Sequence, residues 1–126
     1  MFHREDILYE DNHLLVVNKH AGDLVQPDPQ GNSALENEIK EFIKVRDHKP
    51  GAVFLGVVHR IDRPVSGAVL FAKTSKALAR LNEMIKNRQI AKRYWAIVEN
   101  MPDKTEGTQR HSIWPDAKRN RAKEHA

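Results

Sequence analysis

One stretch of the chain decides the fold: Ala52-Val-Phe-Leu-Gly-Val-Val-His59-Arg-Ile-Asp62-Arg-Pro-Val-Ser-Gly67-Ala-Val-Leu-Phe-Ala72. Its two apolar ends, residues 52–58 and 68–72, are rich in β-branched and aromatic side chains, which is typical of buried strands. The middle part interrupts them with charged and titratable residues, a proline and a glycine. The pattern predicts two strands joined by a polar connection at the end of a sheet, where scaffolds commonly display chemistry.

Three further strands are predicted outside this stretch. Residues 7–9 and 14–18 are short apolar runs joined through Asp11 and Asn12, which tolerate turn conformations. Residues 92–99 form the last run with strand character. The chain then loses its periodicity, so residues 103–126 are expected to be a basic, poorly structured tail.

Two helices are predicted from apolar residues that recur at helical intervals. The first covers residues 34–45, and Ser33 before it has the spacing of a capping box with Glu36 in its first turn. The second runs from Thr74 or Ser75 to about residue 88. Two helices among these strands indicate an α+β fold with a mixed, mainly antiparallel sheet.

Length and composition exclude several classes of protein. The chain has 126 residues, of which 40% are apolar, so a single domain is expected. It has no cysteine, which excludes a disulfide scaffold, a thiolate nucleophile and a cysteine-ligated metal site. The N-terminus lacks the apolar core of a signal peptide, and no apolar run approaches the length of a membrane span. We therefore expect a soluble, cytoplasmic protein.

Charge is distributed unevenly along the chain. Residues 1–50 carry a net charge of −4 and residues 51–126 carry +8, which gives +4 in total. A basic surplus of this kind is typical of a surface that binds a polyanion such as nucleic acid. The alternative interpretation is a basic helix and tail that are simply solvated.

Asp62 is the candidate for chemistry in the polar connection. It lies between Arg60 and Arg63, and cationic neighbours favour the ionised form of a carboxyl group. An ionised, positioned aspartate can act as a nucleophile or as a general base. An aspartate among arginines can equally be a salt-bridge cluster on the surface, and spacing alone leaves both interpretations open.

Three segments, taken in order, resemble one known family. The segment His59-Arg60-Ile61-Asp62-Arg63-Pro64-Val65-Ser66-Gly67 resembles the His-Arg-Leu-Asp-x-x-Thr-Ser-Gly signature of the RluA-type pseudouridine synthases. Upstream, Leu15-Val-Val-Asn-Lys19-His-Ala-Gly22 is similar to the Val-Val-Asn-Lys-Pro-Ala-Gly segment of that family. Downstream, Lys92-Arg-Tyr94 is similar to its Lys-x-Tyr strand.

The resemblance implies that uridine in RNA is isomerised to pseudouridine. The glycosidic bond to N1 is broken, the uracil turns, and it is reattached through C5. Because no redox change or group transfer occurs, the resemblance implies no cofactor and no metal. It makes Asp62 the catalytic aspartate, whether that residue attacks the sugar, attacks the base or removes a sugar proton.

The resemblance also assigns residues around Asp62. Tyr94 matches the active-site tyrosine that lies against the target uracil, whereas its neighbours alone would favour a core aromatic residue on a strand. Arg60 matches the arginine that enters the RNA helix where the flipped nucleotide was, and its simpler alternative is a salt bridge to Asp62. Arg63, Lys19 and Lys92 are expected to support the site or to bind RNA. A solvated turn lysine is the alternative for Lys19.

His59 is expected to be a structural, hydrogen-bonding residue. His20 stands where the family usually has proline, and Val65 stands where it usually has threonine. The family also has a Gly-Arg-x-His-Gln-Ile-Arg segment, and nothing in residues 100–126 resembles it. Residues 1–126 are therefore expected to be a partial catalytic domain, and sheet edges left unpaired make self-association plausible.

Two other classes of function remain open. The chain could be an RNA-binding module in which the helix over residues 75–88 and the basic segment 118–123 hold phosphates without catalysis. It could also be a structural domain whose acidic and basic parts associate internally. Neither the target RNA, rRNA or tRNA, nor the modified uridine is encoded in any motif of the sequence.

Overall fold

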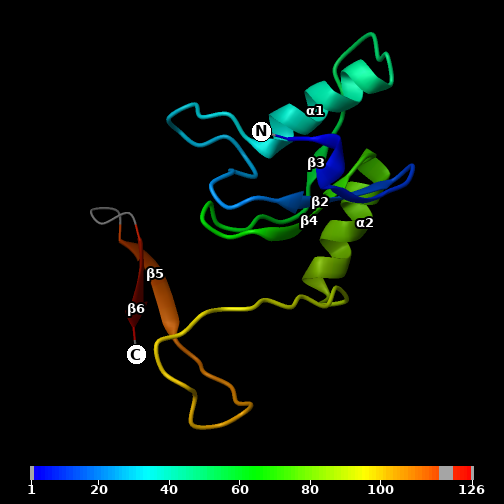
Figure 1. The fold of residues 1–126 in the computed structure, drawn as a ribbon. Coiled ribbons are helices and arrows are strands. Elements are labelled where there is room, and N and C mark those ends of the chain that lie inside the picture. The colour runs from blue at the N-terminus through cyan, green and yellow to red at the C-terminus, as the bar shows by residue number, and fades with distance from the viewer. Residues whose placement is uncertain (1, 117–120, 126) are drawn as a thin grey trace. The chain divides into compact units, whose positions relative to one another are not determined.

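The computed structural model describes residues 2–116 and 121–125 of the chain (Figure 1). It consists of two compact units, Met1–Lys92 and Arg93–Ala126. The first unit holds both helices and a four-stranded sheet, and the second holds a two-stranded sheet. The short 3-10 helix η1 (Arg4–Asp6) precedes the sheet. The architecture confirms the predicted α+β class.

The sheet of the first unit is antiparallel throughout, with the order β1-β2-β4-β3. Its strands are β1 (Ile7–Glu10), β2 (Leu14–Lys19), β3 (Gly56–Val57) and β4 (Gly67–Ala72). The two central strands pair over their full length, from Leu14 opposite Ala72 to Lys19 opposite Gly67. This register places the start of β4, and with it the polar connection before β4, beside the end of β2.

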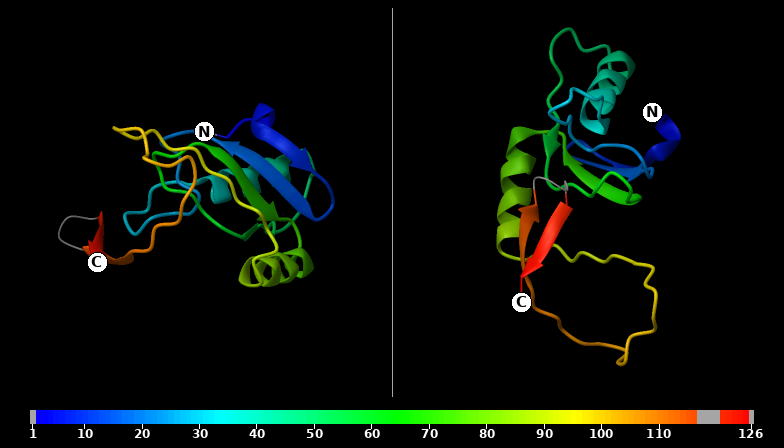
Figure 2. Two further views of the ribbon diagram at one scale, coloured as in Figure 1. Left: turned by 90° about the horizontal axis from the view of Figure 1, so that it is seen from below. Right: turned by 90° about the vertical axis from the view of Figure 1, so that its left-hand side faces the viewer.

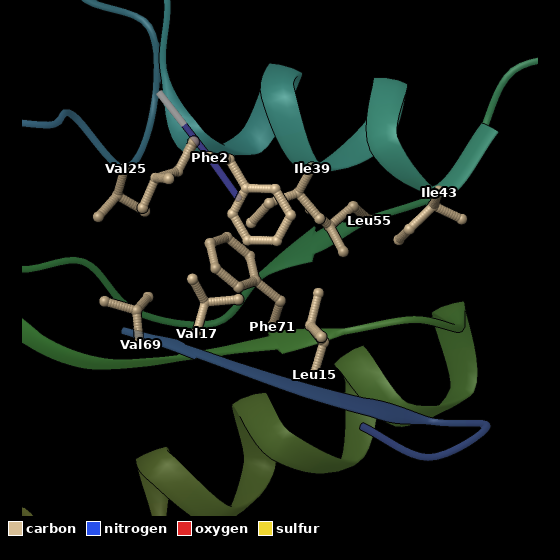
Figure 3. Close-up of a cluster of buried hydrophobic side chains, with 10 residues drawn as sticks. Phe2, Leu15, Val17, Val25, Ile39, Ile43, Leu55, Val69 and Phe71 are labelled. Carbon is tan, nitrogen blue, oxygen red and sulfur yellow. The ribbon is translucent and has the colours of Figure 1, made fainter. Parts of the chain in front are cut away.

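One face of the sheet packs under helix α1 (Leu35–Arg46). Side chains alternate between the two faces of a strand, so every second residue of β2 and β4 points toward this helix. Figure 3 shows the resulting cluster between α1 and the strands. The buried members are Phe2, Leu15, Val17, Val25, Leu35, Ile39, Ile43, Leu55, Val69 and Phe71.

The opposite face is partly covered by helix α2 (Ser75–Lys86), which lies beyond the strands in Figure 3. Ala77 and Leu81 of α2 are buried with Ala72, and the partly buried Leu14 and Leu70 pack against them. The sheet is therefore the middle layer between two helices. Both helices begin and end within two residues of their predicted bounds.

The two helices begin differently. Of the two predicted caps, Thr74 and Ser75, it is Thr74 that caps α2, because its hydroxyl accepts a hydrogen bond from the Ala77 amide at 3.1 Å. The capping box predicted for α1 at Ser33 is wrong, since Ala34 is the N-cap and makes no side-chain cap. The amides of Leu35 and Glu36 instead donate to carbonyl oxygens of the preceding loop at 2.8 and 3.1 Å. Carbonyl groups of the preceding loop thus satisfy the first amides of α1 in place of a side-chain cap.

An ion-pair network ties the end of α1 to the sheet. Arg46 binds both oxygens of Glu10 at 2.7 and 2.8 Å, and Lys73 also donates to Glu10. Hydrogen bonding to Arg46 lowers the pKa of Glu10 to about 2, against the opposing effect of its partial burial. This bidentate geometry is the kind of ion pair that holds a defined position.

The strand predicted over residues 52–58 is much shorter in the structure. Only Gly56 and Val57 pair with β4, and Gly56 lies opposite Ala72, the last residue of β4. Residues 52–55 extend past the point where the chain leaves the sheet toward α2, so β4 offers them no partner. Leu55 is still buried in the core.

The second unit departs from two predictions. The strand predicted over residues 92–99 is wrong: this segment is extended without a ladder, and Figure 2 draws it as coil in both views. The poorly structured tail is also wrong in part, because β5 (Ser112–Asp116) pairs antiparallel with β6 (Arg121–His125). Residues 118–120 of the predicted basic segment 118–123 lie outside the described residues. No helix of the described chain is long and apolar enough to cross a membrane.

Candidate active site

The polar connection of residues 59–66 leads from β3 to β4 and carries Asp62. Ile61 packs against the core cluster under α1, while Arg60 and Asp62 on either side of it are exposed. One apolar anchor therefore fixes the middle of the connection and turns the neighbouring charged side chains outward. The Val65 amide donates to the Asp62 carbonyl at 2.9 Å, which closes a tight turn directly after the aspartate.

Lys19 holds this turn from beneath. Its side chain is fully buried at the end of β2, and its ammonium group donates to three backbone carbonyl oxygens. The acceptors are His20 at 3.1 Å, Arg63 at 3.0 Å and Val65 at 2.5 Å. Burial lowers the pKa of Lys19, and the nearby carboxylates of Asp23 and Asp62 act in the opposite direction. The structure therefore places Lys19 in support of the turn and within electrostatic range of Asp62.

A second set of hydrogen bonds joins the turn after β2 to the connection. The Gly22 amide donates to the Arg63 carbonyl at 2.7 Å, and the Arg63 guanidinium donates back to the Gly22 carbonyl at 3.0 Å. Gly22 has φ +97° and Gly67, at the start of β4, has φ +139°. Both values lie where side chains are disfavoured, so glycine suits the two positions at which these turns meet the strands.

His59 fixes the other end of the connection. Its Nε2 accepts a hydrogen bond from the Leu70 amide at 3.0 Å, which requires the neutral ring with its proton on Nδ1. Burial and, to a smaller extent, the charge of Lys92 lower the pKa of His59. Nδ1 is itself buried and has no hydrogen-bond partner in the described part of the chain. The structure thus gives His59 the hydrogen-bonding role that was predicted.

The arginines beside Asp62 do not pair with it. Arg63 is directed to Gly22, and within residues 2–116 and 121–125 neither Arg60 nor Arg63 forms an ion pair with Asp62. The salt-bridge alternative for this cluster therefore has no support in the structure. The Asp62 side chain is exposed, and the backbone that follows it is held by Lys19 at the carbonyl groups of Arg63 and Val65.

The remaining predicted residues lie in two places. Lys92 ends the first unit and is exposed, near enough to His59 to affect its pKa. Tyr94 belongs to the second unit, where its side chain is 62% exposed. Its place against the target uracil stays a prediction. Among the described residues, no group of three or more histidine, aspartate or glutamate side chains could hold a metal ion.

The contact between His20 and Asp6 is another that sequence reasoning missed. His20 Nε2 lies 2.7 Å from one oxygen of Asp6, whose other oxygen accepts the His3 amide at 3.0 Å. The bond to His20 lowers the pKa of Asp6. The contact links η1 to the turn that binds Arg63. The departure from proline at position 20 was the only signal for it in the sequence.

Comparison with known proteins decides the family. Residues 13–126 match the RNA pseudouridylate synthase family over nearly the whole chain. The chain belongs to this family. The match includes the connection that carries Asp62, the turn that supports it and the segment with Tyr94. The RluA-type resemblance drawn from the three motifs is thereby confirmed.

Individual relatives of this pseudouridylate synthase chain agree. A ribosomal large subunit pseudouridine synthase C of Buchnera aphidicola is 38% identical over 110 residues, covering 87% of this chain and 29% of the relative. The protein of the same description from Escherichia coli is 41% identical over 92 residues, covering 73% and 27%. The chain therefore spans less than a third of the length of these relatives.

A solved structure gives the same fold. Human RNA Pseudouridylate Synthase Domain Containing 4 matches with a TM-score of 0.57 at 24% identity, over 68% of this chain and 31% of that one. At this level of identity the likeness concerns the fold alone.

Proposed function

We propose that this chain supplies the aspartate-bearing part of an RNA pseudouridine synthase, which isomerises uridine to pseudouridine in structured rRNA or tRNA. The observation that carries the proposal is the support of Asp62. A buried ammonium group holds the carbonyls of Arg63 and Val65, and the Asp62 carboxylate is left exposed and uncommitted to either arginine. The type of reaction is inferred from membership of the RNA pseudouridylate synthase family.

The arrangement suits a reaction that needs one ionised carboxylate in a fixed position. Lys19 places a positive charge beneath the turn, within electrostatic range of Asp62. Its hydrogen bonds restrain the backbone, so that less ordering is needed when the nucleotide arrives. In the reaction, the bond from C1′ to N1 breaks and a bond from C1′ to C5 forms. The hydrogen on C5 is lost to solvent, and N1 gains a proton.

The other predicted residues have roles in the same proposal. Tyr94 lies against the uracil of the flipped nucleotide, because an aromatic face accommodates a base taken out of its stack. Arg60 is exposed beside Asp62 and enters the RNA at the position the nucleotide has left. Lys92 contributes positive charge near His59 at the border of the site. No cofactor or metal takes part in the proposed reaction.

Release of tritium from RNA labelled at C5 of uridine tests the proposal. The chain is incubated with labelled rRNA or tRNA, next to the isosteric variant Asp62→Asn. We expect release with the wild type and none above background with the variant. Asp62 is exposed, so the variant should keep the thermal midpoint of the wild type, which serves as the control. Turnover by Asp62→Asn would remove the catalytic assignment.

A second candidate function is an RNA-binding module without catalysis. It is favoured by exposed cationic side chains on α2 that have no acidic partner among the described residues, Lys76 and Arg80. It predicts RNA binding that weakens steeply with salt, equal in wild type and Asp62→Asn, and no tritium release from either.

Self-association through sheet edges belongs to the same proposal. β1 and β3 are the outer strands of the first sheet, and an unpaired edge can accept a strand from a second copy. Sedimentation velocity over a hundredfold range of protein concentration tests this. A sedimentation coefficient that does not change with concentration argues against it.

A further inference from the structure

A pocket lies at the end of the first unit opposite to Asp62. It is formed between the turn joining β1 to β2 and the first three turns of α2, and its volume is about 300 Å³. Leu14, which lines it, and Lys19, which holds the Asp62 turn, are the two ends of β2. Five residue steps along a strand separate them by about 17 Å. The pocket is therefore distinct from the candidate active site.

The pocket combines an apolar floor with a cationic rim. The floor consists of Leu14, Ala77, Leu81 and Met84. Lys76 and Arg80 stand on the rim one helical turn apart, and His13 lies across from them. Both cations are exposed, and neither forms a hydrogen bond or ion pair with any described residue. Their charges are thus available to a ligand.

The acidic residue of the pocket is already satisfied. Asp11 accepts the amides of His13 and Leu14 at 2.8 and 2.7 Å through one oxygen, and the Tyr9 hydroxyl at 2.8 Å through the other. These hydrogen bonds lower the pKa of Asp11. The first turn of α2 carries no acidic residue, so the positive end of the helix dipole is not offset there. Lys76 and Arg80 outnumber the single carboxylate of Asp11 in the lining, so the net charge of the pocket favours an anion.

We infer that this pocket binds one nucleotide of an RNA strand together with the phosphates on both sides of it. Lys76 and Arg80 are spaced about 6 Å apart on the helix, so each can take one of two consecutive phosphates. The base lies on the floor, where Met84 is 37% exposed and its thioether offers a soft apolar contact. Because the proposal concerns RNA, it rests on the proposed function, and it adds a contact remote from the reacting uridine.

The salt dependence of RNA binding tests the inference. The double variant Lys76→Gln/Arg80→Gln is compared with Lys40→Gln/Lys44→Gln, which removes two lysines at the same spacing on α1. For two lost phosphate contacts to a single strand, the slope of log K against log salt should become shallower by about 1.4. The α1 variant should keep the wild-type slope. Fluorescence anisotropy with a labelled oligouridylate measures both.

A third variant separates the base contact from the phosphate contacts. Met84→Ala should weaken oligouridylate binding several-fold without changing the salt slope. The thermal midpoints of all variants show whether the fold is kept. Amide shifts of His13, Ala77 and Met84 on addition of oligouridylate locate the ligand by NMR.

Three outcomes would overturn the inference. If the α1 and α2 double variants both made the salt slope shallower by the same amount, RNA would bind through the general positive charge of the chain. If neither double variant changed the salt slope, RNA would bind elsewhere on the chain. Polyglutamate could shift the same amides as strongly as the oligouridylate, which would make the site one for acidic peptides. Asp62→Asn keeps the pocket, so it should bind with the wild-type slope whether or not tritium release supports the proposed function.

Discussion

Two segments of this chain carry family motifs of similar apolar character, yet the structure treats them differently. β4, which follows the Asp62 connection, is paired on both sides and contributes the fully buried Phe71. Residues 93–99 are extended without a ladder, and Trp95 and Ile97 are almost fully exposed. Strand propensity alone does not produce a strand, because backbone groups and side chains must find partners.

Truncation of one aromatic residue in each segment gives the largest expected contrast. Phe71→Ala removes a buried side chain and leaves a cavity, so the free energy of unfolding should fall by about 4 kcal/mol. Trp95→Ala removes a side chain that is 96% exposed, and the change should stay within about 0.5 kcal/mol. Urea denaturation measures both. A large loss in Trp95→Ala would show that residues 93–99 are packed in solution.

Lys19 tests the support of the Asp62 connection. Lys19→Met keeps the length of the side chain but leaves three carbonyl oxygens without their donor, which should cost about 3 kcal/mol of unfolding free energy. Lys44→Met on the exposed surface of α1 is the matched control and should be nearly neutral. Equal stability of the two variants would contradict the buried role of Lys19.

His59 should make stability depend on pH. Its folded pKa is lowered from the ordinary value of 6.5, so the unfolded chain binds a proton first as the pH falls. The stability contributed by His59 is therefore present above pH 6.5 and is lost as the pH falls through the lowered value. Urea midpoints at a series of pH values measure this loss.

His59→Gln offers an acceptor for the Leu70 amide but cannot titrate, and it should flatten the pH dependence in this range. His59→Ala should lose about 1 kcal/mol at neutral pH, where the hydrogen bond is formed. A wild-type slope retained in His59→Gln would assign the pH dependence to another group.

The contact between His20 and Asp6 has the smallest expected effect. His20→Ala should lower stability by about 0.5 kcal/mol or less, since the histidine side chain is 57% exposed. The pKa of Asp6 is lowered from 3.8, so its contribution is present above that pH and is lost as the pH falls through the lowered value. Thermal midpoints of wild type and His20→Ala should converge at low pH. A difference that persists there would point to packing instead.

Much of the fold could be predicted from local patterns. The helices, β1, β2 and β4 follow from periodicity, and the Thr74 cap follows from its position before a helix. The errors occur where a distant partner decides the outcome. Residues 52–55 lose their ladder because β4 has already ended, and α1 is capped by a loop because that loop passes over its first amides.

The candidate site also has features that local patterns predict and contacts that only distant partners decide. Asp62 and its exposure follow from a polar connection between two apolar runs. The partners of Arg63 and His59 are separated from them by 41 and 11 residues, and no spacing in the sequence predicts such contacts. The pocket beside α2 likewise joins a turn and a helix that are distant in the chain.

The sequence by itself determined the fold class, the family motifs and the position of Asp62, because periodicity and short motifs are local properties. Only the tertiary structure decided that Lys19 is buried beneath the Asp62 turn and that Arg63 binds Gly22 and not the aspartate. A lysine at the end of a strand can point to solvent or to the core, and the choice depends on which carbonyl groups the rest of the chain brings to it. Here the chain brings the carbonyl groups of Arg63 and Val65 to the end of β2, and Lys19 is buried where it donates to both.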